Sequence, residues 1–317
     1  MKNNEIIIGP YEQGTYNTVD IKKCMLQSQT ADEVIALFRE LLHKYKIMPY
    51  DKKTGKGTIR HIIIRSNKNN ELMLIIVTTI EDFSNKNKLI NDLKNNSKEI
   101  KTIVQNINNK KTNLVMGQKN IILYGQGTIN DTIGNLNFTI SPETFFQVNP
   151  KQTEKLYKTA IEYADLNKDD ICFDIYCGIG TISLMAAKYA KKVYGVEIVE
   201  QSIINAKENA LANNIKNVEF FAGKAEEILP KLYKNNIIAD VVIVDPPRKG
   251  CEKEVIDTII NMAPEKIVYI SCNPATLARD VKLLETGGYS LKKVQPVDQF
   301  PWTVHTEVVV LLQHQGH

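Results

Sequence analysis

A cysteine and a glutamate lie beside apolar runs of the sequence, where they could take part in catalysis. Cys272 follows the run at 266–271 and precedes a helical pattern, and the positive end of a helix can lower the pKa of a thiol. Glu307 opens the run at 308–312, so partial burial would raise the pKa of its carboxyl group and suit it to proton transfer. The two residues are candidates for a nucleophile and a base. The alternatives are a buried structural cysteine and an exposed acid at a strand end.

A glycine turn lies between a predicted strand and a predicted helix. Residues 174–183 have the sequence DIYCGIGTIS, and a Gly-x-Gly turn lets a ligand approach the backbone closely. Glu197 follows Gly180 by 17 residues and ends the next predicted strand, where an acid can accept hydrogen bonds from ribose hydroxyls. Ser183 stands where a dinucleotide fingerprint has a third glycine. The pattern therefore favours S-adenosylmethionine over a nicotinamide cofactor, and the alternative is a purely structural turn.

A third feature follows another predicted strand, which ends at Asp245. Pro246 and Pro247 come next, and proline fixes φ and removes a hydrogen-bond donor, so this segment should be stiff and exposed. Such a segment would hold Asp245 in a cleft beside the reactive end of the cofactor. The alternative is a turn in which Asp245 only caps the following helix.

The elements that position these residues form a regular alternation after residue 150. Strands are predicted over 171–175, 192–197, 218–221, 239–245 and 266–271, with helices between them and a closing pair near 290–297 and 306–312. This alternation predicts an α/β fold with a mostly parallel sheet that is covered by helices on both faces. Ligands bind such sheets at the carboxyl ends of the strands, so the candidate residues should meet there.

The first part of the chain has a different pattern and a different charge. A helix over 30–45, strands over 59–65 and 72–79, a polar helix over 85–96 and short strands between 104 and 140 predict a small α+β domain. Residues 1–140 hold 20 Lys/Arg and 13 Asp/Glu, a net charge of +7, whereas residues 141–317 hold 20 and 23, a net charge of −3. A basic module attached to an enzyme suggests nucleic acid as the partner. The alternative is a Lys/Asn-rich bias on solvated faces.

Five stretches within 141–312 resemble, in order, the motifs of the RNA uridine-5-methyltransferase family, which makes 5-methyluridine in ribosomal and transfer RNA with S-adenosylmethionine. They are SPETFFQVNP, DIYCGIGTIS, GVEIVEQSI, DPPRKG and SCNPATLARD, followed by HTEVVV. The resemblance implies a doubly wound, Rossmann-like methyltransferase domain over 141–317. A basic α+β RNA-binding domain would precede it over 1–140.

The resemblance also implies a role for each matching residue. Cys272 would attack C6 of uracil, and Glu307 would remove the proton from C5. The pocket for the cofactor and the target base would be lined by Gln147, Tyr176, Glu197 and Asp245. Phe145 and Phe146 would either line the target-base side of that pocket or pack in the core.

The chain departs from the family in its first residues. Many members carry an N-terminal RNA-binding barrel and an iron–sulfur site, of which only Cys24 resembles a ligand, namely the isolated last one. Because a four-iron cluster takes four thiolates, we expect no iron–sulfur cluster and no other metal in this chain. We expect either a truncated fragment or a short natural form. The Cys24 remnant resembles the ribosomal branch, which favours 23S ribosomal RNA over transfer RNA as substrate.

Composition sets limits on the location of the protein and on its chemistry. No apolar run approaches the roughly 18 residues of a membrane-spanning helix, and the N-terminus lacks a signal-peptide core, so we expect a cytoplasmic protein without a membrane partner. The five cysteines are odd in number, which argues against a disulfide framework. No obligate protein partner is implied.

Three functions from different classes remain open at this point. Methylation of uridine C5 in RNA uses every motif. An amino-group methyltransferase is compatible with the Asp-Pro-Pro segment but leaves Cys272 without a role. A non-catalytic RNA-binding module would use only the basic first part.

Overall fold

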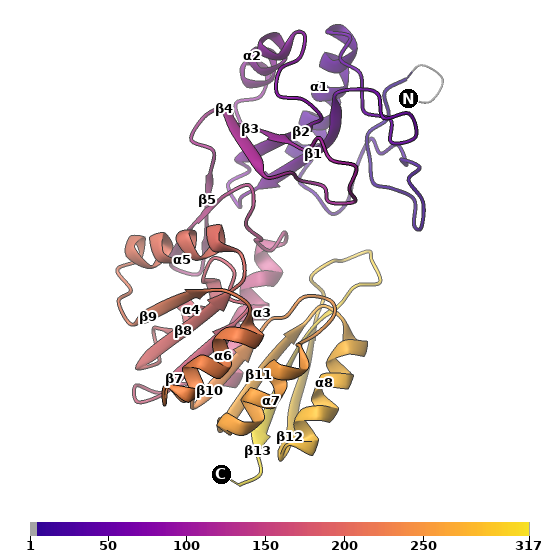
Figure 1. Ribbon diagram of the computed structural model, residues 1–317. Coiled ribbons are helices and arrows are strands. Elements are labelled where there is room, and N and C mark those ends of the chain that lie inside the picture. Colours follow the sequence, from indigo (N-terminus) through magenta and orange to yellow (C-terminus); the bar gives the residue numbers. More distant parts are fainter. Residues whose placement is uncertain (1–4, 317) are drawn as a thin grey trace. The chain divides into compact units, whose positions relative to one another are not determined.

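The computed structural model describes residues 5–316 and divides the chain into two compact units at Ile129/Asn130 (Figure 1). This division precedes Ser141, where the sequence predicted that the second domain begins. The reason is the small sheet of β5 (Ile129–Ile133) and β6 (Leu136–Ile140), which is bound to a helix of the second unit. The backbone amide of Thr139 donates to Asn209 Oδ1 at 2.8 Å, for example.

The first unit contains a four-stranded sheet and two helices. The strands lie in the order β1 (Ile59–Ser66), β2 (Leu72–Thr78), β3 (Ile100–Ile107) and β4 (Lys119–Tyr124). Only β2 and β3 are parallel, and α2 (Lys86–Asn96) crosses between them, while α1 (Gln29–Lys44) precedes the sheet. The apolar faces of both helices pack with β2 in one core, so the predicted α+β unit has a core of its own.

The second unit is built on a seven-stranded sheet. Its strands are β7 (Ile171–Ile175), β8 (Lys192–Glu197), β9 (Val218–Ala222), β10 (Val241–Val244), β11 (Lys266–Ser271), β12 (Tyr289–Val297) and β13 (Glu307–His314). They lie in the order β12-β13-β11-β10-β7-β8-β9, and β13 alone runs antiparallel to its neighbours. The strand order reverses at β7, which pairs with both β8 and β10, and ligands of open α/β sheets bind at such a point.

Helices cover both faces of this sheet. They are α3 (Pro150–Ala164), α4 (Thr181–Ala186), α5 (Glu200–Ala212), α6 (Ala225–Lys234), α7 (Lys253–Met262) and α8 (Pro274–Thr286). Figure 1 shows α6, α7 and α8 in front of the sheet and α3 behind it. All four residues of β10 are buried, as expected of a central strand between two helical layers. The predicted doubly wound fold is confirmed. Within residues 5–316, no helix is both long enough and apolar enough to cross a membrane.

The turn between β7 and α4 depends on left-handed backbone conformations. Tyr176, Gly178 and Gly180 have φ values of 68°, 54° and 82°. A Cβ atom on Gly180 would lie 3.0 Å from Phe220 Cζ and 3.2 Å from Ala206 Cβ, whereas a Cβ on Gly178 would meet nothing within 4 Å. Gly180 is therefore required for packing as well as for backbone geometry, and Gly178 for backbone geometry alone.

We expect Gly180→Ala to lower the free energy of unfolding more than Gly178→Ala does. Both substitutions place a side chain at positive φ, at a cost of about 1–2 kcal/mol. Gly180→Ala adds overpacking against Phe220 and Ala206, typically ~1–3 kcal/mol. Urea unfolding of the two variants measures the difference. Equal losses would contradict the role of Gly180 in packing.

Candidate active site

The carboxylate of Glu197 is fixed at the glycine turn. Its Oε2 accepts a hydrogen bond from the amide of Gly178 at 3.2 Å, and its Oε1 accepts one from the amide of Val199 at 2.8 Å. The turn is joined to β8 as well, because the amides of Tyr176 and Cys177 both donate to the carbonyl oxygen of Val196. A half-buried acid is thus held beside backbone that a ligand can approach.

A small pocket opens beside this turn at the carboxyl end of β7. It is lined by Phe145, Phe146, Tyr157, Tyr176, Cys177, Gly178, Ile179, Thr181, Ile182 and Asp245. Of the four residues that the sequence proposed for the pocket, Tyr176 and Asp245 line it directly. Phe145 is 66% exposed, whereas Phe146 also packs against Phe138, so the two phenylalanines differ in environment.

Gln147 and Glu197 do not line the pocket themselves, but each contacts a residue that does. Glu197 holds the amide of Gly178, and Gln147 is buried beside the hydroxyl group of Tyr157. Burial, and then the nearby Asp245, raise the pKa of Tyr157, and hydrogen bonds with Thr181 and Gln147 lower it. Tyr157 and Thr181 were not singled out from the sequence. Tyr157 belongs to the apolar pattern of α3, which gives no sign of a role in a pocket.

The pairing of β11 with β13 brings Cys272 and Glu307 together. The two strands are antiparallel, and their register ends at Ser271 opposite Val308. Cys272 directly follows Ser271 and Glu307 directly precedes Val308, so both lie at the same end of the paired strands, and the charge of Glu307 acts on the Cys272 thiol. The cysteine is half-buried, and Glu307 is only 4% exposed. The two candidate catalytic residues are therefore neighbours.

The pKa of the Cys272 thiol is raised above its ordinary value of 9.0, contrary to the prediction from the sequence. Burial is the largest cause, and the negative charges of Glu307 and Asp245 add to it, while Arg248 acts in the opposite direction. The prediction considered only the helix that follows the cysteine. It missed two carboxyl groups that other strands bring to the same place.

Burial also raises the pKa of both neighbouring carboxyl groups. For Glu307 it is the main cause, partly offset by Arg248, which confirms the direction expected from the sequence. For Asp245 the shift is large, and the charges of Glu307 and Asp174 increase it further. The positive charge of Arg248 thus lowers the pKa of both Cys272 and Glu307.

The segment that carries Asp245 and Arg248 is tied to the segment that carries Cys272. The carbonyl oxygen of Arg248 accepts hydrogen bonds from Asn273 Nδ2 at 3.0 Å and from Thr276 Oγ1 at 3.2 Å. Asn273 also caps α8, because its side chain accepts from the amide of Ala275. These contacts fix the spacing between the Asp-Pro-Pro segment and the cysteine.

A second set of contacts, the Asp280 network, holds the end of the same segment. Asp280 is fully buried, and its Oδ2 accepts from the Tyr269 hydroxyl at 2.7 Å and from the amide of Cys251 at 2.9 Å. Its Oδ1 accepts from Arg279 Nε at 2.8 Å, and the same guanidinium donates to the carbonyl oxygen of Lys249. One carboxylate thus connects β11, α8 and the residues after Arg248.

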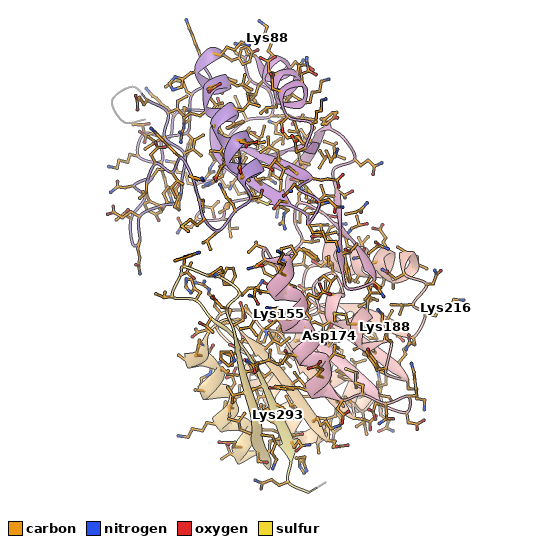
Figure 2. The ribbon with its side chains drawn as sticks, turned by 180° about the vertical axis from the view of Figure 1, so that it is seen from behind. Lys88, Lys155, Asp174, Lys188, Lys216 and Lys293 are labelled. Carbon is orange, nitrogen blue, oxygen red and sulfur yellow. The ribbon has the colours of Figure 1, made fainter. Side chains whose placement is uncertain are left out.

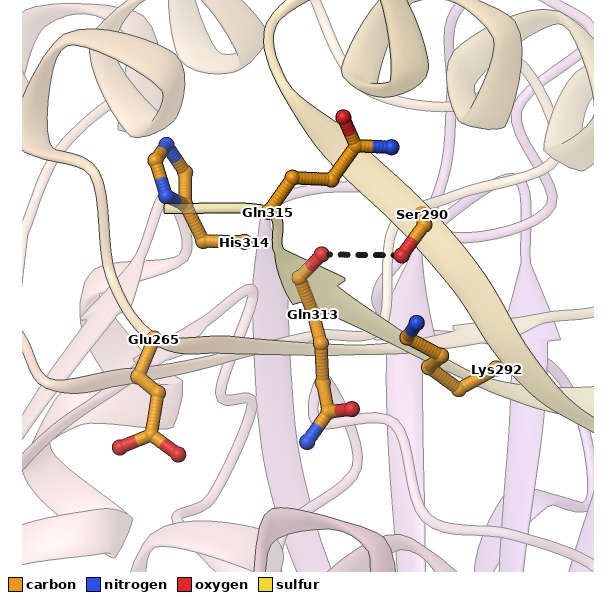
Figure 3. Close-up of a pocket in the computed structure, with 6 residues that line it drawn as sticks. All are labelled: Glu265, Ser290, Lys292, Gln313, His314 and Gln315. Atoms are coloured by element: carbon orange, nitrogen blue, oxygen red, sulfur yellow. Dashed lines mark hydrogen bonds between the residues drawn. The ribbon is translucent and has the colours of Figure 1, made fainter. Parts of the chain in front are cut away.

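A larger hollow of about 350 Å³ lies at the opposite end of the sheet (Figure 3). It is lined by Glu265, Ser290, Lys292, Gln313, His314 and Gln315. Glu265 directly precedes β11, so this hollow is at the end where the parallel strands begin. None of the candidate catalytic or cofactor residues lines it, and ligands of such sheets bind at the other end.

Within residues 5–316, no group of three or more His, Cys, Asp or Glu side chains is placed so that it could hold a metal ion. Cys24 is the one cysteine in the first unit. Its surroundings do not fit a four-iron cluster, which takes four thiolates.

Nearly the whole chain is similar to known proteins. A model of the tRNA (uracil-5-)-methyltransferase family matches residues 22–315. The chain belongs to this family. The family and the enzyme class predicted from the sequence, an RNA methyltransferase, are therefore confirmed.

Relatives with similar sequences are also described as RNA methyltransferases. Proteins described as uncharacterized RNA methyltransferases are 48% identical over 316 residues in Clostridium tetani and 50% identical over 311 residues in Listeria innocua. The matches cover 99% and 98% of this chain and 69% and 68% of those proteins. This chain thus spans about two thirds of the length of these relatives.

A solved structure resembles both the fold and the sequence. The tRNA (uracil-54, C5)-methyltransferase of Pyrococcus abyssi, in complex with S-adenosyl-L-homocysteine, is 29% identical, with a TM-score of 0.76. The match covers 93% of this chain and 70% of that one. The S-adenosylmethionine predicted for this family member agrees with the ligand of that structure.

We expect Asp280→Ala to destabilise the second unit strongly, by ~3 kcal/mol or more. The substitution removes the acceptor of several buried hydrogen bonds and leaves their donors unpaired. Tyr269→Phe is the matched control, since it removes only one of the hydrogen bonds that Asp280 accepts and should cost about 1 kcal/mol. Urea unfolding measures both losses. Similar losses would show that Asp280 does not organise the network.

Glu307→Gln should make Cys272 react faster with iodoacetamide at a fixed pH below the pKa of the thiol. The carboxylate raises that pKa, so its removal increases the fraction of thiolate. Arg248→Met should act in the opposite direction, because Arg248 lowers the pKa. Peptide mapping by mass spectrometry gives the rate at Cys272, with Cys24 as an internal reference. A slower reaction of Glu307→Gln would contradict the assigned electrostatics.

Proposed function

We propose that this family member methylates C5 of a uridine in RNA with S-adenosylmethionine, with Cys272 as nucleophile and Glu307 as general base. The observation that carries the proposal is the β11–β13 register, whose last pair, Ser271 opposite Val308, leaves Cys272 and Glu307 as the next residues at the same end of the two strands. Cys272 would be idle in an amino-group methyltransferase, and neither residue would be needed in a simple RNA-binding module.

The residues at the carboxyl end of β7 fit the proposed cofactor. Tyr176, Gly178 and Asp245 would contact it, and Glu197 would accept hydrogen bonds from the ribose hydroxyls. The space beyond the Cα of Gly178 is open, which leaves room for a ligand against the backbone. When bound, S-adenosylmethionine supplies an electrophilic methyl group for the target base.

Cys272 would make the target base reactive. Its sulfur forms a bond to C6 of uracil, and the electrons of the C5=C6 double bond move to give an enolate whose C5 is nucleophilic. Arg248 and the N-terminus of α8 would favour the thiolate that this step needs, against the two carboxyl groups that disfavour it. The base must leave its stack in the RNA to reach the sulfur.

Glu307 would complete the reaction. After methylation its carboxylate takes the proton from C5, the bond between C6 and sulfur breaks, and the C5=C6 double bond and the thiolate are restored. The raised pKa of Glu307 makes its carboxylate a stronger base than an exposed glutamate.

Two RNA substrates are supported by different observations. Cys24 resembles the last iron–sulfur ligand of the ribosomal branch, and the Pyrococcus abyssi relative is a transfer-RNA enzyme. We propose 23S ribosomal RNA as the substrate, with transfer RNA as the alternative. Unmodified preparations of both RNAs, offered separately, distinguish them.

The test is methyl transfer from labelled S-adenosylmethionine, with the RNA digested to nucleosides afterwards. The wild type should yield 5-methyluridine, and Cys272→Ala should yield none. Glu307→Gln should lower turnover by about 10²–10⁴-fold and accumulate a covalent protein–RNA adduct that is visible on a denaturing gel. Methyl transfer by Cys272→Ala would overturn the mechanism, and a methyl group on nitrogen would favour the amino-group alternative.

A further inference from the structure

Two tyrosines of the first unit present their rings to solvent. Tyr11 is 45% exposed and Tyr16 is 56% exposed, and their ring centroids lie 5.9 Å apart in an edge-to-face arrangement. The backbone of Tyr11 pairs with that of Thr18, so both rings belong to one turn of the chain. Exposed aromatic rings that are held in place are suited to stacking with a ligand.

Lysine and asparagine side chains from two other segments meet Tyr16. Lys52 Nζ lies 3.4 Å from the centroid of the Tyr16 ring and donates to Asn113 Oδ1 at 2.9 Å. The hydroxyl group of Tyr16 donates to the same oxygen at 3.1 Å. Three parts of the sequence therefore form one surface.

Arg60 fixes the loop that carries Lys110 and Lys111. Its Nη1 donates to the carbonyl oxygens of Asn108 at 2.7 Å and Lys110 at 2.8 Å. The guanidinium group also lies over the ring of Tyr50, 4.9 Å from its centroid. The two lysines are exposed on a loop that is tied down by its backbone.

This surface is strongly basic. Residues 50–61 and 108–115 hold six Lys/Arg and one acid, Asp51, whose carboxylate accepts from the amides of Lys53 and Thr54. Within the described part of the chain, no lysine of these two ranges forms an ion pair. The positive charges of Lys53, Lys56, Lys110 and Lys111 are therefore available to an anionic partner, while Lys52 already contacts the Tyr16 ring and Asn113. The patch, as we call it, consists of Tyr11, Tyr16, Lys52, Lys53, Lys56, Lys110 and Lys111.

We propose that the patch binds a single-stranded segment of the RNA substrate, with bases stacked on Tyr11 and Tyr16 and phosphates at the lysines. Single strands expose the faces of their bases, and basic grooves with aromatic rings use both faces and phosphates. A duplex stacks its own bases and would offer only phosphates. The inference rests on the proposed function, because it takes the substrate to be RNA.

The experiment measures binding by fluorescence anisotropy, with the full chain and a labelled single-stranded RNA of about 16 nucleotides. The same RNA annealed to its complement is the second probe. Titrations at about 50 and about 200 mM salt give the salt dependence of the affinity. The wild type should bind the single strand more tightly than the duplex.

Substitution of the lysines and of the tyrosines should affect RNA affinity and its salt dependence differently. K110E/K111E should weaken binding about tenfold or more and reduce the slope of log K against log salt by about 1.4, or ~0.7 for each phosphate contact of a single strand. Y11A/Y16A should weaken binding of the single strand about fivefold or more without changing that slope. It should leave binding of the duplex unchanged.

The matched control is K88E/K98E, which makes the same change of charge in the same unit. Lys88 lies on α2 (Figure 2), Lys98 follows that helix, and both are exposed. This variant should bind within about twofold of the wild type, since it removes no phosphate contact. Thermal unfolding by circular dichroism shows whether each variant is folded.

The patch and the proposed function can fail separately. If K110E/K111E binds as tightly as K88E/K98E, or if Y11A/Y16A binds as tightly as the wild type, the patch is overturned even when 5-methyluridine is formed. If the wild type makes no 5-methyluridine but the variants lose binding as expected, the proposed function fails and the patch stands as an RNA-binding surface.

Discussion

The antiparallel pairing of β13 with β11 is the constraint on which the candidate site depends. β13 is the one strand that runs against its neighbours in the large sheet, and its residues from Glu307 to Leu312 are buried. Side chains alternate between the two faces of a strand, so a slip of one residue would move Glu307 to the other face, away from Cys272. Burial of the strand therefore fixes the position of the proposed base relative to the proposed nucleophile.

The same burial brings together carboxyl groups that disfavour the ionisation of one another. The pKa of Asp174 is raised to about 7, mainly by burial, even though Ser183 Oγ donates to its Oδ2. Asp245 and Glu307 are shifted in the same direction. A positively charged ligand relieves such a cluster, because it stabilises the ionised carboxylates. The sulfonium of S-adenosylmethionine has that charge, so the electrostatics and the proposed cofactor are complementary.

The sequence predicted the strands because apolar runs mark them, and it pointed to Tyr176 and Asp245, which line the pocket, because they follow strands. It could not predict contacts between distant segments. The raised pKa of Cys272 comes partly from Glu307, on β13, and from Asp245, which follows β10, and the prediction was wrong for that reason. Likewise, Tyr157 lines the pocket from a helix whose pattern shows only core packing. The β5–β6 sheet joined the second unit through side-chain hydrogen bonds that no local pattern reveals.

The motifs DPPRKG and SCNPATLARD form one structural object, although a long stretch of sequence separates them. The second motif begins with the cysteine loop and ends with Asp280, and its side chains bind backbone atoms of Arg248, Lys249 and Cys251. These hydrogen bonds link the two motifs, so they set the distance from Asp245 to Cys272. The order of residues in each motif thus reflects packing and hydrogen bonding as much as chemistry. Asp280 bonds to Tyr269, Cys251 and Arg279, none of which lines the pocket. It nevertheless holds the segment that presents Asp245 and Arg248, two of the charges that act on the thiol.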